Sequence, residues 1–208
     1  MLARHRLARR IRRTPDVDPA IADAMIATPR HRFVRWRYRL RAYRDFSLPT
    51  GDGTTISQPT YVARVLSAAR VTRGDNVLEI GCGSGWTAAI LARVARSVVT
   101  VDCVPDLIER ARPRLAHLRN VRVVEGDGVH AVDGTFDVIF VMCGGPRVPP
   151  SFTERLRDGG RLVMPVGRRR SARGMHGNVV RVTRHGDTFI EVPLFEGDWN
   201  TLGGVDGY

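Results

Sequence analysis

Two stretches in the first seventy residues place apolar side chains three and four positions apart, which is the spacing of one helical face. They predict helices over Pro19–Ala27 and Pro59–Ala69. Asp18 stands just before the first helix and is a suitable N-cap, because its carboxylate accepts hydrogen bonds from free backbone N–H groups. The rest of this region lacks the period, and we expect a basic arm or helix start over residues 1–14, irregular chain over Pro29–Phe46 and a turn-rich loop over Leu48–Thr55.

From residue 76 the pattern changes to short apolar runs that alternate with helical spacing. Strands are expected at Asn76–Ile80, Ser97–Val101, Val121–Glu125, Phe136–Met142 and Arg161–Pro165, and helices at Trp86–Val94, Asp106–Leu118 and Ser151–Leu156. Val179–Arg184 and Thr188–Pro193 look like a final antiparallel pair. The chain therefore predicts a doubly wound, Rossmann-like α/β sheet with an antiparallel C-terminal end. A small helical extension over residues 1–70 would cover the site of a ligand-binding domain over residues 71–208, in one compact unit.

The first strand of this region runs directly into three alternating glycines. The segment is Gly81-Cys82-Gly83-Ser84-Gly85, and a helical pattern follows it. Glycine has no Cβ, so such a turn lets backbone N–H groups approach a ligand closely. A tight strand-to-helix turn that binds nothing has the same spacing, and the loop alone does not decide between the two.

Acidic turns follow at the ends of the next two strands. Asp102 comes 23 residues after Glu79, at a position that hydrogen-bonds ribose hydroxyls in nucleoside-binding α/β folds. Gly126-Asp127-Gly128 ends the third strand, where an acidic side chain can meet the amino edge of a purine. Because the carboxyl ends of parallel strands share one edge of a sheet, the three turns predict a single nucleoside-binding crevice.

The carboxylate of Glu79, just before the glycines, favours one class of ligand. It would repel the pyrophosphate of a nicotinamide dinucleotide, whereas S-adenosylmethionine carries a sulfonium and an amino group. We therefore predict S-adenosylmethionine as the ligand, with S-adenosylhomocysteine as the product left after methyl transfer.

The composition is that of a globular protein with an excess of arginine. Of the 208 residues, 43% are hydrophobic, and no run approaches the roughly 20 apolar residues of a membrane span. The first residues lack a secretory signal, so we expect a cytoplasmic protein without a membrane partner. Cys82, Cys103 and Cys143 lack metal-ligand spacing, which predicts reduced thiols and no metal. The formal net charge of +12 indicates either an anionic partner or a solvated arginine-rich surface.

Several segments together resemble the protein-L-isoaspartate O-methyltransferase family. The most specific is Ile56-Ser57-Gln58-Pro59, which generic methyltransferases lack. The others follow in the family's order at Pro29–Val34, Ala42–Asp45, Val77–Ala89, Gly126–Gly128, Gly159–Gly167 and Val192–Leu194. The resemblance covers about residues 17 to 195.

This resemblance implies methyl transfer to an isoaspartyl or aspartyl carboxylate of a protein or peptide, after which the ester closes to a succinimide. Ser57 matches the family's active-site serine and would donate a hydrogen bond that orients the carboxylate; an alternative role is to cap the helix over Pro59–Ala69. The residues expected at the donor are Thr55, Ile56, Ser57, Glu79, Gly81, Cys82, Gly83, Ser84, Gly85, Asp102, Cys103, Gly126, Asp127 and Gly128. Those expected near the acceptor are Gln58, Cys143, Gly144 and Arg147.

The segment Met142–Arg147 departs from the family's pattern, because it is glycine-rich and adds an arginine. This departure supports a second interpretation, a tailoring enzyme that methylates one aspartate of a ribosomally made peptide to give an aspartimide. Basic residues would then grip an acidic or dedicated peptide. A third interpretation, a nucleic-acid-binding methyltransferase, follows from the charge and from arginines interleaved with aromatic residues over Arg35–Arg44. Against it, Val141-Met142-Cys143 lacks an Asn/Asp-Pro-Pro-Tyr base pocket. We expect a peptide or protein partner rather than nucleic acid, in an oligomeric state left open.

Overall fold

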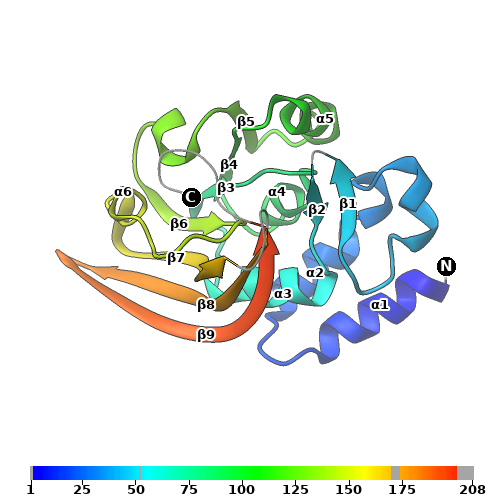
Figure 1. Ribbon diagram of the computed structural model, residues 1–208, viewed down its shortest axis with the longest axis horizontal. Helices are drawn as coiled ribbons and strands as arrows, with labels where there is room; N and C mark the ends of the chain where they lie inside the picture. Colours follow the sequence, from blue (N-terminus) through cyan, green and yellow to red (C-terminus); the bar gives the residue numbers. More distant parts are fainter. Residues whose placement is uncertain (1, 52, 170–173, 201–208) are drawn as a thin grey trace.

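The computed structural model describes residues 2–51, 53–169 and 174–200, and its centre is a seven-stranded sheet (Figure 1). The strands are β3 (Asn76–Ile80), β4 (Ser97–Asp102), β5 (Val121–Glu125), β6 (Phe136–Val141), β7 (Leu156–Arg169), β8 (Gly174–His185) and β9 (Thr188–Asn200). Their spatial order is β5-β4-β3-β6-β7-β8-β9. The strands from β5 to β7 in this order pair in parallel, and β8 and β9 are antiparallel. The predicted doubly wound sheet with an antiparallel end is confirmed.

Helices cover both faces of the sheet. They are α1 (Leu2–Arg13), α2 (Pro19–Ala27), α3 (Pro59–Ala68), α4 (Trp86–Leu91), α5 (Pro105–Leu115) and α6 (Pro150–Thr153), with short 3₁₀ turns η1 (Arg30–Arg32), η2 (Trp36–Arg41) and η3 (Gly128–Ala131). Apolar side chains of α1 to α5 form one buried cluster with Val77, whereas η3 and α6 pack on the face of Leu78. Neighbouring residues of a strand point to opposite faces, so β3 contributes to both clusters.

The N-terminal segment forms a layer on the side of the molecule away from the β8–β9 turn (Figure 1). Asp18 caps α2 as predicted, since its Oδ1 accepts a hydrogen bond from the N–H of Ala20 at 2.7 Å. The predicted loop over Leu48–Thr55 was wrong, because β1 (Leu48–Gly51) and β2 (Thr54–Ile56) form an antiparallel hairpin. Leu48 pairs with Ile56, and burial of both side chains outweighs the turn-forming composition between them.

The strands at the C-terminal end extend well beyond the apolar runs that predict them. In the ladder of β7 and β8, Gly167 lies opposite Gly177, and a Cβ on either glycine would overlap the backbone of the partner strand. Hydrogen bonds and the close approach of the two strands hold this end of the ladder together. Neither requires alternating apolar residues, so the hydrophobic pattern does not predict these residues as strand.

Within the residues that the structure describes, no helix is both long and apolar enough to cross a bilayer.

Candidate functional site

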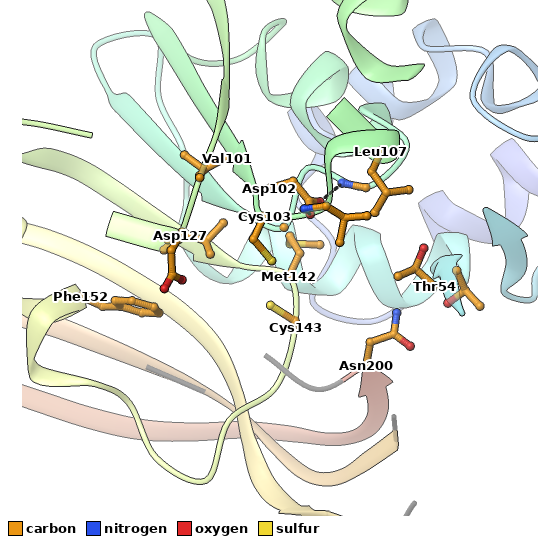
Figure 2. Close-up of a pocket in the computed structure, with 17 residues that line it drawn as sticks. Thr54, Val101, Asp102, Cys103, Leu107, Asp127, Met142, Cys143, Phe152 and Asn200 are labelled. Carbon is orange, nitrogen blue, oxygen red and sulfur yellow. Dashed lines mark hydrogen bonds between the residues drawn. The ribbon is translucent and has the colours of Figure 1, made fainter. Parts of the chain in front are cut away.

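A cavity opens at the carboxyl ends of β3, β4, β5 and β6 (Figure 2). The strand order reverses here, because β4 and β6 lie on opposite sides of β3, and open α/β sheets bind ligands at such a point. Each strand contributes the turn that follows it, and β2 and β9 close the remaining side. The polar and glycine residues of the lining are Thr54, Thr55, Gly81, Gly83, Asp102, Cys103, Gly126, Asp127, Gly128, Cys143 and Asn200.

The glycines of the loop after β3 have different structural roles. Gly83 and Gly85 adopt φ angles of +52° and +81°, which side chains rarely tolerate. A Cβ on Gly83 would meet no atom within 4 Å, so this turn faces the open cavity. A Cβ on Gly85 would lie 3.1 Å from Leu115 of α5. Gly83 therefore leaves room for a ligand, and Gly85 leaves room for helix packing.

Asp102, at the end of β4, fixes the glycine loop to the neighbouring strand. Its Oδ2 accepts a hydrogen bond from the N–H of Gly83 at 2.8 Å, and its Oδ1 accepts one from Val104 at 3.1 Å. Burial raises the pKa of Asp102, and backbone hydrogen bonds oppose this rise. A carboxylate offers about four acceptor positions, so Asp102 retains capacity for ligand hydroxyls at the cavity wall.

Glu79 is completely buried beneath the same loop and does not line the cavity. Its Oε2 accepts a hydrogen bond from the hydroxyl of Thr100 at 2.6 Å, whereas Oε1 has no hydrogen-bond partner among the described residues. Burial raises the pKa of Glu79 to about 7. A buried carboxylate with an unsatisfied oxygen is stabilised by positive charge nearby, so Glu79 favours a cationic ligand above the loop.

The cavity is elongated, with different chemistry at its two ends. Figure 2 shows Asp127 and Phe152 at one end, and Thr54 and Asn200 at the other. A Cβ on Gly128 would lie 3.6 Å from the Phe152 ring, so the glycine brings the backbone close to a flat apolar surface. An aromatic face beside a carboxylate and a glycine backbone suits a purine, because such a base needs both stacking and polar contacts.

A second, wider cleft adjoins the end marked by Thr54 and Asn200. Its volume is about 630 Å³, against about 240 Å³ for the cavity. Thr55, Met142 and Asn200 line both spaces, so the two meet across one shared wall. Ser57 and Gln58 line the cleft and not the cavity. A small ligand in the cavity and a larger molecule in the cleft would therefore come together beside this wall.

The buried Arg30 holds the segment that carries Ser57. Its guanidinium donates hydrogen bonds to the carbonyl oxygens of Ile56 and Ser57, at 3.2 and 3.0 Å. It also donates to the carbonyls of Ala42, Arg44 and Phe46. Burial lowers the pKa of Arg30 to about 10, which still leaves the side chain charged at neutral pH. One cation thus joins two stretches of backbone, residues 42–46 and 56–57, and fixes the position of Ser57.

The start of α3 is organised by Asp45 rather than by Ser57. Gln58 is the residue at the N-cap, and neither it nor Ser57 makes a side-chain capping bond. Instead Asp45 Oδ1 accepts a hydrogen bond from the N–H of Thr60 at 3.0 Å, and Asp45 Oδ2 accepts one from Gln58 Nε2 at 3.2 Å. Arg10 of α1 pairs with the same carboxylate at 3.3 Å. The Ser57 hydroxyl is therefore not used as a helix cap, and its residue lines the cleft.

The unusual glycine after β6 is explained by packing. Gly144 is buried, and a Cβ at this position would overlap the indole of Trp199 on β9. Its N–H also donates to the carbonyl of Asn200 at 2.7 Å. Gly144 therefore lets the end of β9 close over the sheet, while Arg147 is exposed and lines neither the cavity nor the cleft.

The structure brings most, not all, of the predicted donor residues to the cavity. Those outside its lining are Ile56, Ser57, Glu79, Cys82, Ser84 and Gly85. Ile56 and Ser57 belong to the segment of β2, where Ser57 lines the cleft, and the other four belong to the end of β3 and its glycine loop. Of the predicted acceptor residues, Gln58 lines the cleft and Cys143 lines the cavity. Sequence reasoning missed Thr54, Ile80, Val101, Val104, Leu107, Met142, Phe152 and Asn200. Their lining role follows from tertiary packing, although those next to the strand ends could have been found from the predicted topology.

Comparison with known proteins decides which family this geometry belongs to. The family model described as "Protein-L-isoaspartate(D-aspartate) O-methyltransferase (PCMT)" matches residues 4–193. The chain belongs to the protein-L-isoaspartate O-methyltransferase family. A relative of that name from Desulfotalea psychrophila is 40% identical over 195 residues, which cover 92% of this chain and 89% of the relative. Another from Roseiflexus sp. strain RS-1 is 42% identical, over 82% of this chain and 78% of the relative.

Solved structures agree with this family assignment. One described as a protein-L-isoaspartate O-methyltransferase is 30% identical, with a TM-score of 0.84 over 98% of this chain and 67% of the other. A second, from Plasmodium falciparum and in complex with S-adenosyl-L-homocysteine, has a TM-score of 0.79 over 95% of this chain and 96% of the other. At 18% identity the second structure shows a common fold. The fold is thus that of the class I methyltransferases.

The residues of this family member fit an S-adenosyl ligand. Gly83 faces the cavity without a side chain, and the elongated space offers an aromatic face at one end and a buried carboxylate beneath the loop. Burial raises the pKa of Cys143, so this thiol enters the lining as an uncharged group. Asp102 and Asp127 are the carboxylates of the lining, and carboxylates accept hydrogen bonds from hydroxyl and amino groups but repel phosphates.

Proposed function

We propose that this protein transfers the methyl group of S-adenosylmethionine to the carboxylate of an isoaspartyl residue in a protein or peptide. The observation that carries the proposal is the wall of Thr55, Met142 and Asn200, which separates a nucleoside-type cavity from the cleft that holds Ser57. Donor and acceptor would meet across that wall. Membership of the family supports the isoaspartyl substrate, because curated relatives bear that activity in their names.

The chain's own residues would hold the donor in one direction along the cavity. Asp127, Gly128 and Phe152 would receive the adenine, and Asp102 would accept hydrogen bonds from the ribose hydroxyls. The far end near Thr54 and Asn200 would receive the amino-acid portion. When bound, S-adenosylmethionine supplies an electrophilic methyl group on a sulfonium.

The acceptor requires positioning more than activation. A carboxylate is ionised at neutral pH and is already a nucleophile, so the site needs no strong base. Ser57 would donate a hydrogen bond to one oxygen and leave the other to face the methyl group. Orientation of two reactants can contribute roughly 7–11 kcal/mol toward the barrier. Arg30 would support the orientation of the acceptor by fixing the backbone of Ser57.

Methyl transfer to an isoaspartyl peptide and to its normal aspartyl twin tests the proposal. We expect transfer to the isoaspartyl peptide, followed by loss of methanol as the succinimide forms. For Ser57→Ala we expect unchanged donor affinity by calorimetry and a turnover about ten- to a hundredfold lower, because a hydrogen bond to a charged group is lost. Ser47→Ala is the matched control, since Ser47 lines the same cleft outside the motif. Wild-type turnover in Ser57→Ala would remove Ser57 from the mechanism.

A second candidate is a tailoring role on one aspartate of a dedicated peptide. The observation that favours it is the strongly basic α1, whose Arg10 lines the cleft. In the same assay, transfer to an aspartyl peptide encoded beside this gene, with none to the isoaspartyl peptide, would select this role.

A further inference from the structure

The helix α1 divides its side chains between the core and the solvent. Leu7 and Ile11 are four positions apart and buried. Arg12 pairs with Asp23 of α2 at 2.9 Å, and Arg4 donates to the carbonyl of Ile26 at 2.7 Å. These contacts hold one face of α1 against α2 and the core, so the opposite face is available for another role.

On that opposite face, all the charged side chains that line a shallow groove are arginines. Arg6, Arg9, Arg10 and Arg13 border one shallow groove, together with Thr14 and Pro15. All four arginines are exposed, and α1 contains no acidic residue. Among the described residues, Arg6, Arg9 and Arg13 make no ion pair with a carboxylate, whereas Arg10 contacts Asp45. The groove is therefore an anion-attracting surface that the fold itself does not neutralise.

The groove is continuous with the cleft of the proposed acceptor. Arg10 of α1 and Thr14, the residue directly after the helix, line both of them. From Arg6 to Arg13 the helix rises by about 10 Å, which is the length of about three residues of extended peptide. A peptide whose aspartyl residue lies at Ser57 would thus carry its flanking residues onto α1.

We propose that this groove is a subsite for acidic residues that flank the methylated residue of a peptide substrate. The proposal rests on the proposed function, because it places the acceptor in the cleft of Ser57. Peptides that carry Glu or Asp within about three residues of the methylated residue, in the flank that lies along α1, are preferred over peptides with neutral flanks. Arg10 links this subsite to the cleft and to the carboxylate of Asp45.

The charge of the cleft favours a peptide over a nucleic acid. Glu196 and Asp198 of β9 line the cleft that Arg10 also borders. A continuous polyanion passing from the groove into the cleft would meet these carboxylates. A peptide can place acidic side chains on α1 and neutral ones against β9. Its negative charge can therefore be confined to the groove, whereas that of a nucleic acid is spread along the whole chain.

The test compares three isoaspartyl peptides that differ only in their flanks, which are glutamate, glutamine or lysine. Fluorescence anisotropy of labelled peptides, with S-adenosylhomocysteine present, reports binding independently of methyl transfer. We expect the glutamate-flanked peptide to bind about tenfold more tightly than the glutamine-flanked one at low salt, with a smaller difference at 0.5 M salt. Methyl transfer to the same peptides, measured in parallel, tests the proposed function. The subsite and the proposed function are therefore tested by different measurements, and either can fail while the other holds.

Two triple variants distinguish an effect of the groove from an effect of the protein's overall positive charge. In Arg6→Gln/Arg9→Gln/Arg13→Gln we expect the affinity for the glutamate-flanked peptide to fall about tenfold, to that of the glutamine-flanked one. Arg73→Gln/Arg96→Gln/Arg119→Gln removes the same charge from exposed positions elsewhere and should keep the preference. Equal affinity of wild type for all three peptides would overturn the subsite. Displacement of the glutamate-flanked peptide by random-sequence RNA at lower concentration than by unlabelled peptide would overturn it in favour of a nucleic-acid surface.

Discussion

Single carboxylates at the strand ends distinguish this cavity from a plain packing turn. Asp102 and Asp127 both line it, while Asp102 also accepts the N–H of Gly83. When an aspartate both holds a loop and contacts a ligand, its truncation removes both interactions. The affinity for the ligand should then fall for both reasons.

We expect Asp102→Ala and Asp127→Ala each to weaken S-adenosylmethionine binding at least tenfold, or about 1.4 kcal/mol. Isothermal titration calorimetry measures the change directly. Asp133→Ala is the control, because Asp133 is exposed and outside the cavity lining. Unchanged affinity in both cavity variants would show that these carboxylates do not contact the donor.

Glu79 makes the stability of the protein depend on pH. Burial raises the pKa of Glu79 from 4.5 to about 7, so between these values the folded state keeps a proton that the unfolded state releases. The contribution of Glu79 to stability is therefore fully present below about pH 4.5 and is lost as the pH rises toward 7. Glu79→Gln keeps the shape and cannot titrate. We expect its melting temperature, relative to wild type, to increase from pH 5 to pH 7.5; a constant difference would contradict the assignment.

At the scale of elements, the closure of β9 over the turn after β6 depends on a missing side chain. Gly144→Ala would force a methyl group into the indole of Trp199. Overpacking of this kind costs about 1–3 kcal/mol, and we expect that loss in chemical denaturation. In the Trp199→Ala background, Gly144→Ala should cost much less than it does in wild type, because the overlapping ring is gone. Additive losses in the double variant would place the strain elsewhere.

Elements with a strong hydrophobic period were predictable, and elements defined by pairing were not. α2 and β3 follow directly from their apolar positions, and Asp18 caps α2 as its side chain suggests. The hairpin of β1 and β2 was missed because its sequence, with a proline, glycines and threonines, does not alternate in hydrophobicity, although β1 alternates in burial. Glycine turns and acidic strand ends indicated the cavity, but Phe152 and Asn200 reach it only through the folded topology.

At the scale of the whole molecule, the division into residues 1–70 and 71–208 stays a prediction. One buried cluster contains Ile21 and Leu66 of the first part together with Val77 and Val138 of the second. Two parts that share a core cannot unfold separately without exposing it. We therefore expect one cooperative thermal transition, with coincident midpoints by tryptophan fluorescence and far-ultraviolet circular dichroism. Two separated midpoints would show independent domains.

The contacts of Arg30 have a consequence for how this enzyme could diversify. A single guanidinium serves the carbonyls of Ile56 and Ser57 together with those of the chain from Ala42 to Phe46, so a backbone shift in either stretch would break several of its hydrogen bonds at once. Sequence drift there is strongly penalised. On the outward face of α1, by contrast, Arg6, Arg9 and Arg13 make no ion pair with any of the described residues. New acceptor preferences should therefore arise by exchange of residues on α1, and a chimera that borrows this helix from a relative is the shortest route to a re-targeted enzyme.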